Sequence, residues 1–238
     1  LNFASGAILA LDATVDGGAD TDTVTFTATV TDVDDTDFAR VANIEAVSLS
    51  NGNNSVSFGT NAATASGAGA LTITSGTGND TISVSALGKA AHISSTSGNE
   101  NLVGGTGADT FAFGTNLTSA DTVDGGAGTD TLTFTDGDSA TTDLNNVTNV
   151  ETVTLGNAAT SVTTVNALVA SGQSLAVSAA ALTGSNTLTW DGSAESDGTF
   201  NITGSGQNDT ITGGSGNDTI DGGLSLIHIS EPTRPTWI

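Results

Sequence analysis

The residues of this sequence best suited to chemistry are aspartates that recur at one place in a nine-residue pattern. The pattern reads G-G-x-G-x-D-x-U-x, where U is a large apolar residue. Three segments fit it throughout, at residues 104–112, 125–133 and 213–221. The sixth position holds Asp109, Asp130 and Asp218. Carboxylate oxygens bind hard cations such as calcium, and glycine turns leave backbone carbonyls uncrowded beside them. The pattern therefore predicts calcium binding.

Partial copies of the pattern flank the full ones. They have lost glycines, and one carries Glu in place of Asp. Their sixth positions hold Asp22, Asp80, Glu100, Asp121 and Asp209. The turn glycines that complete the candidate ligand set are Gly104, Gly105, Gly107, Gly125, Gly126, Gly128, Gly213, Gly214 and Gly216. One isolated copy would be an ordinary turn that binds nothing, but repetition in phase favours calcium.

The elements that must position these aspartates follow from the apolar spacing. Ile202, Ile211 and Ile220 lie nine residues apart, so each nonapeptide supplies one turn and one short strand with an inward apolar side chain. Two nonapeptides then complete one coil of a parallel solenoid. Neighbouring coils lie about 4.8 Å apart, roughly twice a calcium–oxygen distance. An ion therefore fits between stacked turns.

Counting two nonapeptides to each coil also predicts which turns are stacked. Residues 104–107 should lie on residues 125–128, with Asp109 and Asp130 sharing one calcium ion. Glu100 and Asp121 should face the opposite edge and bind more weakly, because the glycines of the first turn are lost and Glu is longer than Asp.

Composition agrees with a cation-binding protein. Asp and Glu number 26, Lys and Arg number 3, and the net charge is -23. Such a surface repels nucleic acid and anionic lipid, so we expect neither nucleic-acid binding nor membrane insertion. Cys is absent, which excludes disulfides and thiolate metal sites. We expect the chain to be largely expanded until calcium compacts it.

The nonapeptide segments resemble the hemolysin-type, or RTX, calcium-binding repeats. This resemblance implies a right-handed parallel β-roll, calcium held by turn carbonyls and sixth-position aspartates, type I secretion without an N-terminal signal, and folding outside the cell. Blocks between the segments, such as residues 149–155, resemble those of calcium-dependent bacterial surface-layer proteins and large repeat adhesins. We expect an all-β fold of parallel β-roll or β-solenoid segments interspersed with further β-rich solenoid blocks.

A longer repeat divides the chain. Similar segments recur at an offset of about 108, which predicts a first unit over residues 1–110 and a second over residues 111–223. Residues 224–238 resemble a translated sequencing adapter and should share neither the phase nor the composition of the repeats. We also expect the natural chain to extend beyond both ends of this sequence.

No constellation of residues predicts an enzyme. Residues 137–139 read Gly-Asp-Ser, as in a lipase-type nucleophile block, but His92 is the one histidine before the tail and lies far upstream. Two functions remain. One is an extracellular or cell-surface scaffold of the surface-layer or adhesin kind, which could assemble with itself or bind a cell-surface polysaccharide. The other is the calcium-binding C-terminal region of a type I-secreted toxin or hydrolase.

Overall fold

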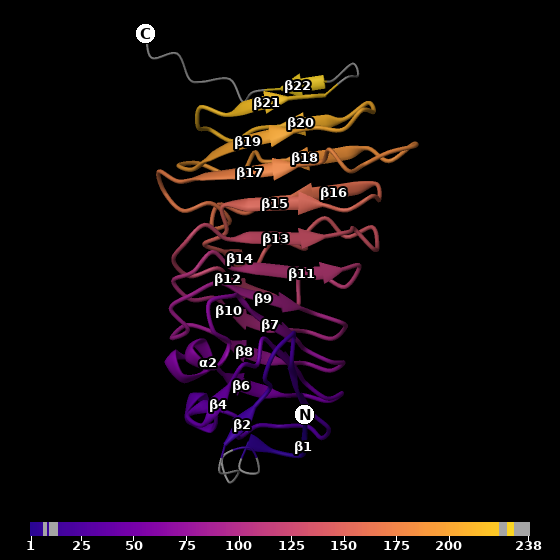
Figure 1. Ribbon diagram of the computed structural model, residues 1–238. Helices are drawn as coiled ribbons and strands as arrows, with labels where there is room; N and C mark the ends of the chain where they lie inside the picture. The colour runs from indigo at the N-terminus through magenta and orange to yellow at the C-terminus, as the bar shows by residue number, and fades with distance from the viewer. Residues whose placement is uncertain (7–8, 10–13, 224–227, 231–238) are drawn as a thin grey trace. The chain divides into compact units, whose positions relative to one another are not determined.

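The chain folds into short parallel strands joined by turns (Figure 1). The computed structural model describes residues 1–6, 9, 14–223 and 228–230. Two compact units are present: unit 1 comprises residues 1–113 and 122–130, and unit 2 comprises residues 114–121 and 131–238. Within a strand such as β3 (Thr23–Phe26), threonine alternates with buried apolar residues, because successive side chains of a strand point to opposite faces.

Unit 1 is a parallel solenoid in which consecutive strands alternate between two sheets. One sheet contains β1 (Asn2–Phe3), β3, β5 (Ala46–Ser48), β7 (Leu71–Thr74), β9 (Ala91–Ser94) and β11 (Thr110–Gly114). The other contains β6 (Ser55–Ser57), β8 (Thr81–Ser83), β10 (Asn101–Val103) and β12 (Thr122–Asp124). The unit is completed by β2 (Val15–Asp16) paired with β4 (Val41–Ala42), the 3-10 helix η1 (Asp35–Phe38) and the helix α2 (Thr60–Ala65).

Unit 2 is built in the same way. Its first sheet contains β13 (Thr131–Phe134), β15 (Thr152–Leu155), β17 (Ser174–Ser178), β19 (Thr199–Thr203) and β21 (Thr219–Asp221). Its second contains β16 (Thr160–Thr163), β18 (Leu188–Asp191), β20 (Thr210–Thr212) and β22 (His228–Ser230). The short strand β14 spans Val147–Thr148.

The strand register confirms that one nonapeptide makes half a coil. Ile202 of β19 pairs with Ile220 of β21, whereas Ile211, midway between them in sequence, lies on β20 in the other sheet. Apolar residues nine apart therefore alternate between sheets, and those eighteen apart stack. The predicted all-β parallel solenoid is confirmed.

The core consists of these stacked apolar side chains. Val24, Ile73 and Leu132 have no exposed surface, and each such side chain contributes roughly 1.5–3 kcal/mol by leaving water. Trp190 and Phe200 pack edge to face with ring centroids 5.5 Å apart. Every coil thus carries its own layer of core, which holds the intervening turns at a fixed spacing.

The structure differs from the sequence predictions in two places. The helices η1 and α2 were not predicted.

The second difference concerns the tail. The expectation that residues 224–238 share no repeat phase is wrong for β22. This strand pairs in parallel with β20 and places Ile229, nine residues after Ile220, opposite Ile211. Residues 224–227 and 231–238 lie outside the described part of the chain.

Candidate metal-binding turns

The turns of the first two full repeats lie in unit 1 and are stacked, as the sequence predicted. Ala127 N–H donates to the Gly105 carbonyl at 2.8 Å, and Gly104 N–H donates to the Asp124 carbonyl at 2.7 Å. Asp109 N–H donates to Asp130 Oδ1 at 2.7 Å. The turn at residues 104–107 therefore lies directly against the turn at residues 125–128.

Glycine is required where these turns meet. A Cβ atom added to Gly104 would lie 2.8 Å from the Gly125 carbonyl carbon and 2.9 Å from Asp109 Oδ2. Gly126 adopts φ +89° and Gly128 φ +149°, conformations that side-chain-bearing residues rarely adopt. The glycines bring carbonyl and carboxylate oxygens of successive turns together with no side chain between them.

Asp109 is positioned by backbone amides on two sides. Its Oδ1 accepts from Ala91 N–H of the preceding coil, and its Oδ2 accepts from Gly105 N–H of its own turn, both at 2.7 Å. Oδ2 also lies beside Gly104, the residue that faces Gly125. An ion between the two turns could therefore contact both Asp109 and Asp130, and the shared site stays a prediction.

The same connection recurs at other sixth positions. In each case a carboxylate oxygen accepts from a backbone N–H one coil earlier, which aligns successive turns. The pairs are Asp80 with Asn54 N–H at 2.7 Å, Asp209 with Leu188 N–H at 2.8 Å, and Asp218 with Phe200 N–H at 2.8 Å. Asn54 continues the series, since its Oδ1 accepts from Val30 N–H at 3.0 Å. Sequence reasoning missed Asn54, although it has the amide form of the same short side chain.

The remaining predicted ligands have other surroundings. Glu100 Oε1 accepts from Ser95 Oγ at 2.9 Å and from Ser75 Oγ at 3.4 Å, all in unit 1. In unit 2, Asp121 Oδ2 accepts from Thr118 N–H at 2.8 Å.

The two outermost predicted turns also differ from the central pair. Asp22 Oδ2 is buried without a hydrogen-bond partner. The turn formed by Gly213, Gly214 and Gly216 carries the half-buried Asp218 and contacts the preceding coil where Ser215 N–H donates to the Glu195 carbonyl at 2.8 Å. The predicted ligands thus occupy turns in both units, and their binding of metal stays a prediction.

The electrostatics of these turns fit a bound cation. Asp80, Asp109 and Asp130 are at most 1% exposed, and burial raises the pKa of Asp80 and of Asp109. Asp80 Oδ2 accepts no hydrogen bond. A buried carboxylate of this kind is costly unless a positive charge or a proton accompanies it.

The lysine and arginine side chains in the described part of the chain do not supply that charge, and at Asp109 the charge of His92 offsets only part of the rise in pKa that burial causes. Arg40 is exposed. Lys89 Nζ donates instead to Ser66 Oγ at 2.7 Å and to the carbonyls of Gly67 and Ala63 at 2.9 and 3.2 Å. Carboxylate and carbonyl oxygens around a closely packed turn are the ligands that calcium prefers.

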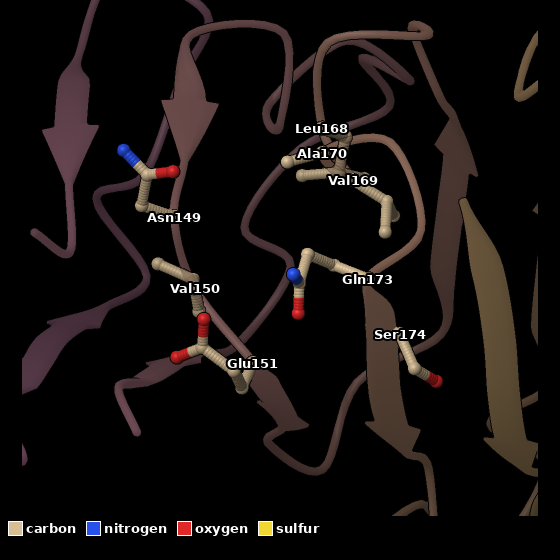
Figure 2. Close-up of a pocket in the computed structure, with 8 residues that line it drawn as sticks. All are labelled: Asn149, Val150, Glu151, Leu168, Val169, Ala170, Gln173 and Ser174. Carbon is tan, nitrogen blue, oxygen red and sulfur yellow. The ribbon is translucent and has the colours of Figure 1, made fainter. Parts of the chain in front are cut away.

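The partly open cavity of unit 2 drawn in Figure 2 is small. It has a volume of about 30 Å³ and is lined on one side by Asn149, Val150 and Glu151 and on the other by Leu168 and Gln173, among others. One water molecule requires about 10–15 Å³ of such a cavity. The cavity therefore has room for a water but not for an organic substrate. No helix among the described residues has the length and hydrophobicity needed to cross a membrane.

The fold and the turns together define a repeat protein with a β-solenoid architecture. Residues 94–112, 117–139 and 201–224 match the family model of the RTX calcium-binding nonapeptide repeat. The chain thus carries RTX repeats, as their resemblance to the hemolysin-type pattern predicted. No curated protein and no solved structure gave a match to this chain.

Proposed function

We propose that this protein is an extracellular, non-catalytic scaffold of the surface-layer or adhesin kind, which folds and becomes rigid when calcium binds between its turns. The observation that carries the proposal is the burial of the sixth-position aspartates in stacked turns. Asp109, Asp130 and Asp209 are at most 2% exposed, and the nearby backbone amides stabilise but do not neutralise them.

Calcium would supply the missing positive charge. Asp109, Asp130 and the carbonyl groups of their glycine turns would hold one ion, and Asp80 and Asp209 are the corresponding ligands elsewhere. Binding between turns would oppose their separation and so favour the folded chain. Extracellular calcium modules have dissociation constants of about 0.1–1 mM, and saturation to 100 times that constant stabilises the fold by about 2.7 kcal/mol per independent site.

The arrangement of the repeats favours a scaffold over the calcium-binding appendage of a secreted toxin or hydrolase. The matching segments are separated by blocks that form further coils of the same kind, such as β15, β16, β17 and β18 in unit 2. An extended scaffold needs this regular stacking, and its partners would be further copies of itself or a cell-surface polysaccharide. Any sequence that adjoins this chain in its gene would distinguish the two functions, since further units would indicate a scaffold and a catalytic domain would indicate an appendage.

Circular dichroism tests the calcium-dependent step. The whole chain is titrated with calcium from 0 to about 10 mM after treatment with EGTA, with the same titration in magnesium and with sodium chloride of matched ionic strength as controls. We expect strand content to rise with calcium and much less with either control. Identical strand content in calcium and in EGTA would refute the proposal.

A further inference from the structure

A second group of carboxylates lies in unit 2, outside the sixth positions of the repeats. Asp136, Asp138 and Asp143 follow β13 and precede β14. One oxygen from each lies within 4.8 Å of the others. Asp136 is 8% exposed and Asp143 is 3% exposed, whereas Asp138 is open to solvent. Two of the three are therefore buried carboxylates next to a third that solvent can reach.

The hydrogen bonds of this cluster leave one buried oxygen unsatisfied. Asp136 accepts from Asp138 N–H and from Ser161 N–H, each at 3.1 Å. Asp138 Oδ1 accepts from Ala140 N–H at 2.6 Å. Asp143 Oδ1 is buried and has no hydrogen-bond partner. Because a buried polar atom without a hydrogen-bond partner destabilises a protein, its presence among two other carboxylates calls for a ligand.

The charge of the surroundings points to a cation. No Lys or Arg lies among the described residues of unit 2. Burial, together with the charges of Asp138, Asp136 and Asp121, raises the pKa of Asp143 to about 6. The like charges therefore repel one another at neutral pH with no positive side chain to offset them.

We propose that Asp136, Asp138 and Asp143 bind a calcium ion at a site separate from the sixth-position aspartates. All three ligands are carboxylates, which suits calcium or magnesium rather than a metal that prefers His or Cys. Two oxygens on one calcium ion can be up to about 5 Å apart, twice the usual bond length, whereas magnesium allows only about 4.2 Å. The spread of these oxygens accommodates calcium.

The site is accessible and has a structural role. An open groove lined by Asp136, Asp138, Ser139 and Ser161 leads to it from the surface. Asp136 already contacts β16 through Ser161 N–H, and Asp143 lies in the turn that leads to β14. This irregular block contains no full nonapeptide. An ion held by all three aspartates would link it to the neighbouring coil.

Counting the bound ions tests this site. Equilibrium dialysis with calcium alone is carried out on the whole chain, on Asp143→Asn, on Asp138→Asn and on the control Asp197→Asn, whose aspartate is exposed. We expect Asp143→Asn and Asp138→Asn each to lose one ion per chain, or to bind it at least tenfold more weakly, with no change in the control. Asp138→Asn alters an exposed residue and so keeps the test valid if Asp143→Asn does not fold. Unchanged stoichiometry and affinity in both variants would overturn the site.

A further variant separates this proposal from the proposed function. Asp130→Asn alters a sixth-position residue of unit 1. If Asp130→Asn loses an ion and the Asp138 and Asp143 variants do not, the calcium-binding turns stand and the additional site is rejected. If only the Asp138 and Asp143 variants lose an ion, the additional site stands and calcium binding by that turn is rejected.

Discussion

Replacing Gly107 with alanine should destabilise the solenoid, because this glycine lies against the backbone of the preceding coil. A Cβ atom there would come within 2.5 Å of three backbone atoms of Lys89 and Ala90, whereas an ordinary contact of this kind is 3.4–4 Å. Neighbouring segments must therefore separate by about 1 Å, roughly a fifth of the spacing between coils. The hydrogen bond from Ala91 N–H to Asp109, now 2.7 Å, would be lost.

Gly107→Ala should lower the free energy of unfolding by about 2–4 kcal/mol. Overpacking contributes about 1–3 kcal/mol, and the lost hydrogen bond contributes about 1 kcal/mol more. Gly107 does not have a positive φ, so the effect comes from the steric clash and not from backbone strain.

Gly206→Ala is the matched control. Gly206 also lies in a repeat turn and lacks a positive φ, but nothing lies within 4 Å of its Cβ position. Urea denaturation of both variants in saturating calcium measures the difference. Gly206→Ala should be neutral or stabilise by up to about 1 kcal/mol. Equal stability of the two variants would refute the close packing of turns on which the site depends.

Two further predictions concern the carboxylates. Asp109→Ala should remove one calcium ion per chain, and adding Asp130→Ala should remove no other, because the two aspartates would share one ion. Calorimetry on both single variants and on the double variant measures the number of bound ions. The loss of two ions by the double variant would refute sharing. In buffer freed of calcium beforehand, lowering the pH from 7 to 5 should shift the equilibrium towards the folded state by about 1 kcal/mol through Asp143. The pKa of this carboxyl is about 6 in the folded chain against an ordinary value of 3.8, so the folded state binds more protons in this range. Strand content at the two pH values gives the measurement, and Asp143→Asn should lose this part of the pH dependence; an identical dependence in the variant would contradict the assignment to Asp143.

The sequence by itself determined the repeat and its consequences. Apolar residues such as Ile202 and Ile220 recur in phase. The parallel coil, the row of inward apolar side chains and the stacking of the glycine turns all follow from this spacing. The family of the nonapeptides is equally visible, because each repeat carries its glycines and its aspartate within nine residues. Local patterns of this kind can be recognised in the sequence without knowing which residues lie on the next coil.

Only the tertiary structure decided how the carboxylates are satisfied. Asp109 accepts from Ala91 N–H, 18 residues earlier, and Asp136 accepts from Ser161 N–H, 25 residues later. The first separation is the eighteen residues of one coil, but the second depends on a block of irregular length, so the sequence pattern does not predict it. The grouping of Asp136, Asp138 and Asp143 was missed for the same reason. Their meeting depends on the path of an irregular turn, and the raised pKa of Asp143 arises from burial and from the charges of nearby carboxylates, which act only once the coils have packed.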